Sequence, residues 1–192
     1  MTTQLCQLSD VQTYLRITNT NSDTLLAALI TNASAIIESF CCRVFGVNAY
    51  TETYNGNGQR KLYLANAPIQ TVTSLTVDGL AVAAAADAIS AGFVFDSDII
   101  YLRPGTVSGY GTAFNRGVQN VSVAYTAGFP AVPSDVAQAC IELVASKYKA
   151  SDRVDVKSQG LGPNQSTTYS IADMPASVKS AIRRYQRWPR RA

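Results

Sequence analysis

The 192-residue chain contains no histidine, and its four cysteines form no CxxC pair. Without histidine it lacks the most common general base and the usual partner of a nucleophilic serine or cysteine. The adjacent Cys41 and Cys42 would point about 100° apart on a helix, which suits neither a shared metal ion nor a mutual disulfide. We therefore expect no metal site, no cofactor, and free thiols that pack as small hydrophobic residues at Cys6, Cys41, Cys42 and Cys140.

Charged side chains are also scarce. They make up 15% of the sequence, against roughly 25% in ordinary soluble domains, while apolar residues reach 47%. This composition favours a surface that is partly hidden in an assembly, although a compact monomer rich in Ser, Thr and Asn would have the same composition. No run of about 18 apolar residues occurs, and the polar N-terminus does not match a signal peptide. We therefore expect neither membrane insertion nor secretion.

The positive charge is concentrated at the C-terminus. Of the chain's 16 Lys and Arg, six lie in residues 174–192, and none of the 13 Asp and Glu lies there. That segment therefore has a formal charge of +6, while the other ten bases and 13 acids give the rest of the chain −3. A cationic end on a slightly acidic body predicts that a partner binds at the C-terminus.

Helical periodicity marks the N-terminal part of the chain. Ser9 followed by Gln12 is typical of a capping box and predicts a short helix through Leu15. Three- and four-residue steps then predict a helix of about 18 residues with one apolar stripe, which must pack along its whole length. The stripe consists of Leu25, Leu26, Leu29, Ile30, Ala33, Ile36, Ile37 and Phe40.

Helical spacing returns after Pro133, and Pro175 is a favoured first-turn residue for a last helix that Pro189 would end. Winding this last helix at 100° per residue places Tyr185 and Trp188 on an apolar side. The opposite side would carry Lys179, Arg183, Arg184 and Arg187. Residues 158–170 are polar and rich in Gly, Pro and Ser, which predicts a mobile loop.

From about residue 50 to 128 the hydrophobic period changes to two, as in strands. Strands are expected at 50–54, 61–64, 93–102 and 118–125, and Asp78-Gly79 suits a two-residue hairpin turn. The sequence thus predicts an α+β protein. A helical core formed by residues 1–47 and 131–192 would carry an inserted antiparallel β-module at residues 48–130.

No catalytic motif is found. Asp96 and Asp98 face one side of an expected strand, as the carboxylate pair of a hydrolase would, but two acids beside a turn are more often solvated. The glycines at 55–58 and 109–111 lack the lysine and the spacing of a phosphate-binding loop. We therefore do not expect an enzyme.

The C-terminal basic segment has three interpretations: a solvated helix face, a contact with nucleic-acid phosphates, or a docking segment for a protein partner. Arginine interleaved with tyrosine and tryptophan is typical of hot spots in protein interfaces, and both aromatic residues fall on the expected apolar side. This favours protein docking over nucleic acid. The residues expected to carry the docking are Arg183, Arg184, Tyr185, Arg187, Trp188, Arg190 and Arg191.

The helical ends of the chain also resemble a family. A polar turn separates residues 8–16 from 25–30, and residues 37–45 follow. Near the C-terminus, residues 139–148 precede a loose loop and a Pro-led segment, 174–187, that ends in Tyr185 and Arg187. In this order, the segments resemble the head-tail connector (adaptor) proteins of tailed bacteriophages, the group similar to the HK97 connector. The minimal members of that group are almost entirely helical, so the β-module at 48–130 departs from them.

The resemblance implies a ring of identical subunits, typically twelve, that lies under the portal protein in the neck of a virion assembled in the bacterial cytoplasm. Such a ring would continue the DNA channel without binding DNA specifically, and it would offer a platform for the tail or for a head-completion (stopper) protein. The resemblance also implies that the C-terminal segment grips the portal. The alternative is a nucleic-acid-binding protein whose C-terminal arginines contact phosphates.

Overall fold

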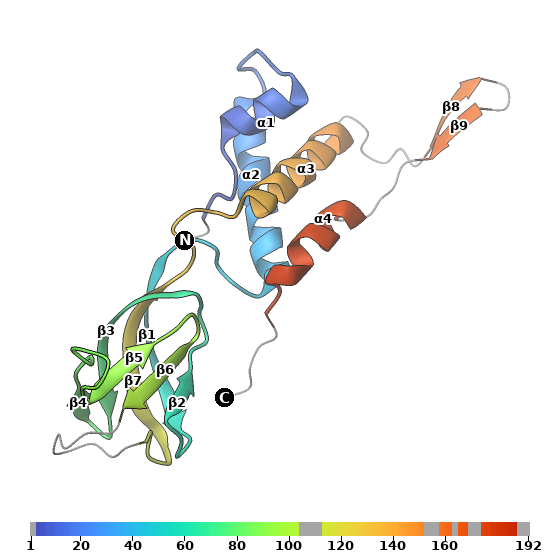
Figure 1. The fold of residues 1–192 in the computed structure, drawn as a ribbon. Coiled ribbons are helices and arrows are strands. Elements are labelled where there is room, and N and C mark those ends of the chain that lie inside the picture. The colour runs from blue at the N-terminus through green and yellow to red at the C-terminus, as the bar shows by residue number, and fades with distance from the viewer. Residues whose placement is uncertain (1–2, 104–112, 152–157, 163–164, 169–173, 188–192) are drawn as a thin grey trace. The chain divides into compact units, whose positions relative to one another are not determined.

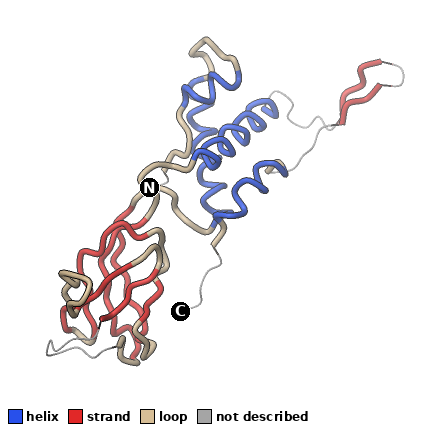
Figure 2. The backbone as a smooth tube through the Cα atoms, viewed as in Figure 1, coloured by secondary structure: helices blue, strands red, loops and turns tan. Residues whose placement is uncertain are grey.

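The computed structural model describes residues 3–103, 113–151, 158–162, 165–168 and 174–187. Their contacts divide into two compact units (Figure 1). Helices from both ends of the chain, within residues 1–43 and 132–187, build one unit, and residues 44–131 build the other. Figure 2 shows the helices in the first unit and the sheets of the second. The α+β class predicted from the sequence is confirmed.

The helical unit contains α1 (Leu8–Leu15), α2 (Asp23–Cys41), α3 (Ser134–Ser151) and α4 (Ala176–Ile182). All four lie where the apolar periodicity predicts helices. The predicted capping box is wrong, because Gln7 is the N-cap of α1 and no side chain caps it. Ser9 is already inside the helix, where its hydroxyl contacts Asp10 (Oγ to Oδ1, 3.5 Å).

Packing of α2 against α3 forms the core of the helical unit (Figure 1). Both helices bury an apolar face, α1 contacts both of them, and α4 packs on α3. From α2 the buried apolar side chains are Leu26, Ile30, Ala33, Ile37 and Cys41. From α3 they are Val136, Ala139, Cys140, Ile141, Leu143, Val144 and Ala145.

The cysteines are free, as predicted. Cys6, Cys41 and Cys140 are buried. The prediction that Cys42 also packs as a small hydrophobic residue is wrong, because it is exposed just after the end of α2. The thiol of Cys6 donates a hydrogen bond to Cys140 (Sγ to Sγ, 3.3 Å). This bond and burial raise the pKa of Cys6, so its thiol stays protonated and packs as an apolar group.

Among the described residues, α2 is the one helix that meets the length and composition of a membrane span. Core helices of soluble proteins meet the same criteria. The buried face of α2 against α3 accounts for much of its apolar character.

The second unit is a sandwich of two antiparallel sheets. The larger sheet has the order β1-β7-β3-β4, formed by β1 (Asn48–Gly56), β7 (Gly117–Ala127), β3 (Ile69–Val77) and β4 (Leu80–Val82). The smaller has the order β2-β6-β5, formed by β2 (Lys61–Tyr63), β6 (Ile99–Arg103) and β5 (Gly92–Phe95). Side chains of both sheets share one hydrophobic core, as the burial of Val123 and Ile100 shows.

The Asp78-Gly79 hairpin is confirmed, because both residues have positive φ (52° and 79°) as a type I′ turn requires. The expected strand at 93–102 is instead two strands, β5 and β6, paired around a turn at residues 96–98. The carboxylate of Asp96 accepts the backbone N–H of Ser97 (2.7 Å), which favours a turn over continued strand.

The strands at 50–54 and 61–64 do not pair with each other. β1 pairs with β7, and β2 pairs with β6 in the other sheet. The prediction of a mobile loop at 158–170 is wrong, since β8 (Ser158–Gly162) and β9 (Gln165–Thr168) form a hairpin. Backbone hydrogen bonds are enough to pair two strands, so a polar composition alone does not exclude them.

The two ends of the sandwich unit lie against each other. The Phe129 N–H donates to the Phe45 carbonyl (2.8 Å), and the two rings stack with centroids 6.1 Å apart. Gly128 (φ 131°) needs to be glycine here, because a Cβ atom would lie 2.2 Å from the Gly46 carbonyl oxygen. The chain therefore enters and leaves the sandwich at one point.

A cluster around Glu52 links three parts of the sandwich. The Glu52 carboxylate accepts hydrogen bonds from Tyr125 of β7 (2.6 Å), from Tyr54 of its own strand, and from the Asn66 side chain (3.0 Å). The Tyr54 hydroxyl in turn accepts the Ala65 backbone N–H (2.9 Å). One carboxylate thus ties β1 to β7 and to the loop after β2.

Replacing Glu52 by Ala leaves three donors without their shared acceptor. We expect Glu52→Ala to lower the free energy of unfolding by about 2 kcal/mol, since hydrogen bonds to a charged group contribute more than neutral ones. Urea unfolding checks this, with Thr53→Ala on the exposed face of β1 as the matched control. Equal stability of the two variants would contradict the prediction.

The same cluster predicts a loss of stability at alkaline pH. Burial and the hydrogen bond to Glu52 raise the pKa of Tyr125 to about 12, and the same causes raise the pKa of Tyr54. The unfolded tyrosines lose their protons first, near pH 10. The free energy of unfolding should therefore be intact below about pH 10 and fall as the pH rises through about 12. Urea midpoints across this range check it, and a smaller fall in Tyr125→Phe would support the assignment.

Candidate functional site

The C-terminal segment leaves the helical conformation earlier than the sequence predicts. α4 ends at Ile182, a single 3-10 turn covers Arg183–Tyr185, and Gln186 is extended. The predicted helix to Pro189 is therefore wrong, and a winding of 100° per residue does not apply beyond Ile182. The residues that follow Ile182 make tertiary contacts with α3 and α2.

Asp135, in the first turn of α3, holds the segment. Its carboxylate forms a salt bridge with Arg184 and accepts hydrogen bonds from the Tyr185 hydroxyl at both oxygens (2.9 and 3.1 Å). The Arg184 guanidinium also lies over the Tyr185 ring, 5.1 Å from its centroid. The helix dipole favours an acid in this turn. Two residues predicted to bind a partner are thus engaged within the chain itself.

The segment then crosses the end of α2. The Arg187 N–H donates to the Cys41 carbonyl (2.9 Å), and the Cys41 thiol donates weakly to the Ile182 carbonyl (3.7 Å). Burial, and next the nearby charge of Arg187, lower the pKa of Arg43. Two guanidinium groups therefore approach each other at this end of the helical unit.

Of the remaining predicted docking residues, one is exposed and three lie outside the described ranges. Arg183 is exposed and forms no ion pair within the described part of the chain. Trp188, Arg190 and Arg191 lie outside the described residues. The structure thus brings Arg183, Arg184, Tyr185 and Arg187 together on one short stretch after α4.

The apolar stripe of α2 divides into two. Leu26, Ile30 and Ile37 are buried against the other helices, as predicted. Leu25 is 44% exposed, and Leu29, Ile36 and Phe40 are only half-buried. The two sets are offset by one residue, about 100° around the helix, so they face different directions.

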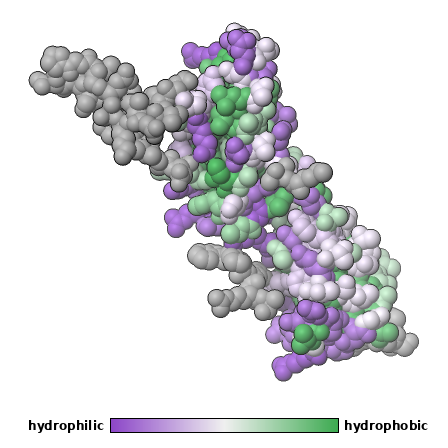
Figure 3. Space-filling model, turned by 180° about the vertical axis from the view of Figure 1, so that it is seen from behind, coloured by the Kyte–Doolittle hydropathy of each residue, from purple (hydrophilic) through white to green (hydrophobic). Residues whose placement is uncertain are grey.

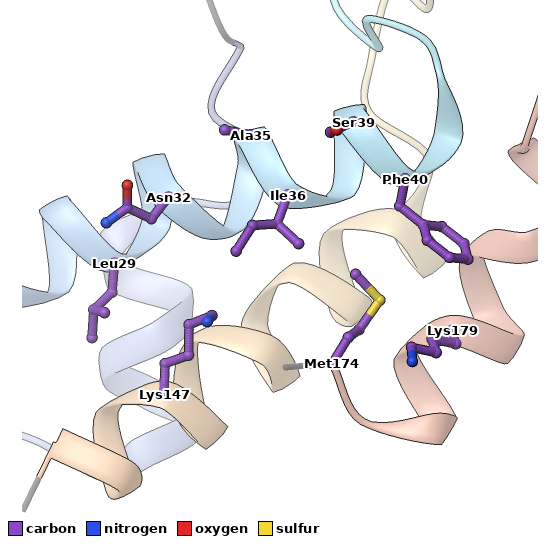
Figure 4. Close-up of a pocket in the computed structure, with 9 residues that line it drawn as sticks. All are labelled: Leu29, Asn32, Ala35, Ile36, Ser39, Phe40, Lys147, Met174 and Lys179. Carbon is purple, nitrogen blue, oxygen red and sulfur yellow. The ribbon is translucent and has the colours of Figure 1, made fainter. Parts of the chain in front are cut away.

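Three residues of the second set, all except Leu25, line a groove (Figure 4). Ile36 and Phe40 project from α2 near Met174, which precedes α4, and Leu29 lies farther along α2 near Lys147. Lys147 and Lys179 supply the charged lining, and the volume is about 820 Å³. Hydrophobic residues also gather on the surface of this unit in Figure 3. We call the surface of these six residues the α2 groove.

Sequence reasoning missed both the role of Asp135 and the α2 groove. Asp135 could have been noticed as an acid in a predicted first helical turn, but its partners are about 50 residues away in sequence. The sequence did contain a sign of the groove. The stripe of eight apolar residues on α2 is wider than the surface that one packed helix can bury.

The acids considered for catalysis belong to a turn. Asp96 and Asp98 lie between β5 and β6 instead of on one strand, where Asp96 accepts the Ser97 N–H and the Asp98 carbonyl accepts the Leu64 N–H (3.0 Å). Within the described ranges, no three His, Cys, Asp or Glu residues are grouped so as to hold a metal ion.

Solved structures share this fold. A chain from the neck of the empty GTA particle, computed with C6 symmetry, is 22% identical and aligns with 97% of this chain and 93% of its own (TM-score 0.57). A chain from the neck of the native GTA particle, computed with C12 symmetry, is 22% identical over 84% and 81% of the two chains (TM-score 0.52). A chain from the virion of the native gene transfer agent is 21% identical over 97% and 92% (TM-score 0.57). No curated protein matches the sequence.

The family model and the shared fold define a protein of the phage head-tail connector type. The sequence model of the head completion protein family matches residues 4–188, so the chain belongs to that family. The resemblance found from the sequence is confirmed at this level. The family and the similar chains are described as structural parts of particles.

Removing the Asp135 carboxylate should release the C-terminal segment. We expect Asp135→Ala to raise the rate of tryptic cleavage after Arg183, Arg184 and Arg187 about tenfold, because the segment loses a salt bridge and the bifurcated hydrogen bond from Tyr185. Mass spectrometry of timed digests checks it. Asp10→Ala, an exposed first-turn acid of α1, should leave the rate unchanged.

Proposed function

We propose that the protein is the head-tail connector of a tailed phage or phage-like particle. It forms a ring, typically of twelve subunits, under the portal in the virion neck, continues the DNA channel, and gives the tail or a stopper protein its platform. The observation that carries this proposal is the family match, which spans nearly the whole chain. The particle necks with C6 and C12 symmetry that contain chains of this fold support a ring.

In this proposal the C-terminal segment docks on the portal. The docking set is Arg183, Arg184, Tyr185, Arg187, Trp188, Arg190 and Arg191. Its members have different roles: Arg184 and Tyr185, held by Asp135, fix the base of the segment on the helical unit. The exposed Arg183, together with Arg187, Arg190 and Arg191, then pairs with acidic groups on the portal, while the aromatic side chain of Trp188 fills a pocket.

The charge distribution suits a channel subunit. Outside residues 174–192 the chain carries a formal charge of −3, so DNA would pass through the lumen without being held. Each ring would present the cationic segment once per subunit. Weak contacts of single segments with the portal therefore add up to strong attachment.

Truncation after Arg187 tests the docking. We expect the protein lacking residues 188–192 to stay folded, because the contacts of Asp135 and Cys41 remain, and to lose most of its binding to the portal. Cosedimentation with purified portal rings measures the loss. Arg16→Ala, at an exposed base in the other half of the chain, is the control for a general loss of positive charge.

The same truncated protein separates docking from nucleic-acid binding. If the C-terminal arginines act on phosphates, truncation should reduce DNA affinity and flatten its salt dependence while portal binding persists. Docking predicts the opposite pair of results.

A further inference from the structure

The α2 groove is an apolar surface without a partner in the described structure of the subunit. Its bulky apolar lining comes from Leu29, Ile36, Phe40 and Met174, and its only charged lining residues are the cations Lys147 and Lys179. The smaller Ala35, Asn32 and Ser39 complete the lining. A ligand that fits it therefore has a bulky apolar side chain and a negative charge beside it.

The sandwich unit displays such a group at the loop between β4 and β5. Ile89 is 92% exposed there, the most exposed large apolar side chain described. Ala86 and Ala88 are small, so Ile89 is the one bulky side chain at the end of this loop. Asp87 is the only charged residue of residues 83–91. We call residues 86–90 the Ile89 tip.

The tip is built by hydrogen bonds. The Asp87 carboxylate accepts the backbone N–H groups of Ile89 (2.8 Å) and Ser90 (2.7 Å), and Arg103 donates to the Asp87 carbonyl (2.7 Å). The hydrogen bonds from Ser90 and Ile89 hold the pKa of Asp87 below its usual value, so it stays negatively charged. An isoleucine held out in this way is ready to be buried by a partner at little entropic cost.

We propose that the Ile89 tip of one subunit inserts into the α2 groove of a neighbouring copy. This rests on the proposed ring, whose subunit contact it names. Ile89 would pack among Leu29, Ile36 and Met174 of the neighbour. Asp87 would then lie near Lys147 or Lys179.

The contact joins two different surfaces, since the tip belongs to the sandwich unit and the groove to the helical unit. Such a heterologous contact repeats from subunit to subunit and closes into a ring when the rotation allows. It also accounts for the apolar side chains of α2 that the subunit leaves half-exposed.

Two variants of the full-length protein test the contact in solution, and two further variants serve as controls. We expect Ile89→Ser and Leu29→Lys each to weaken self-association at least tenfold in sedimentation velocity, because each removes one side of an apolar contact. Val118→Ser, at an 84% exposed residue of the same sandwich, and Ala27→Lys, on an exposed face of the same helix, should assemble normally. Unchanged melting temperatures show that the variants are folded.

Mixing the two defective variants gives a result specific to a heterologous contact. The Ile89→Ser variant keeps an intact groove, and the Leu29→Lys variant keeps an intact tip. Neither variant can associate with itself through this contact, but in a mixture the intact tip can enter the intact groove once for every two subunits. We expect the mixture to form dimers and no larger species. Rings from Ile89→Ser alone would overturn the proposal and leave the connector function standing.

Cross-linking tests the pairing directly in assembled particles. In a Cys42→Ser background, Ile89→Cys with Leu29→Cys should give a ladder of disulfide-linked subunits under copper-phenanthroline oxidation. Links confined to single chains, or links from the thiol introduced at position 89 to another protein, would overturn the proposal. A wild-type protein that stays monomeric both alone and with portal would overturn the proposed function and this contact together.

Discussion

The packing of α2 against α3 is the interaction on which the helical unit depends. It joins segments that are about a hundred residues apart in sequence, and α1 and α4 pack on this pair. Because neither helix can bury its apolar face alone, the two ends of the chain must fold together. The C-terminal segment is then positioned by both helices, since Asp135 of α3 holds Tyr185 and Cys41 of α2 accepts the Arg187 N–H. A force applied to the C-terminal segment by a docking partner would thus be transmitted directly to the core of the helical unit.

Features that depend only on residues close together in the sequence could be predicted from it. The apolar spacing of α2 and the Asp78-Gly79 turn are examples, since helical period and positive φ act within a few residues. Pairings over long distances were not predictable in this way. β1 pairs with β7, some 70 residues later, and nothing within 50–54 indicates this choice. The end of α4 was not predicted either, and the residues just after it contact Asp135, about 50 residues away in sequence.

The candidate site was predictable in its charge but not in its geometry. Counting charges locates the cationic segment, yet it cannot distinguish Arg184, which pairs with Asp135, from Arg183, which is exposed. Likewise, the stripe of α2 predicts a packed helix, but only the structure separates the buried Ile37 from the half-buried Ile36 beside it. Composition reports that apolar surface exists, and tertiary contacts decide how much remains for other molecules.

The contact between Phe45 and Phe129 has an evolutionary consequence. The polypeptide enters and leaves the sandwich through residues that are neighbours in the structure. A gene could therefore gain, lose or exchange the whole segment that encodes the sandwich by recombination, because the two chain ends at this junction lie close together in the protein. A short peptide bridge would suffice to reconnect the remaining helices. The sandwich could therefore change between lineages while the helical scaffold is inherited unaltered.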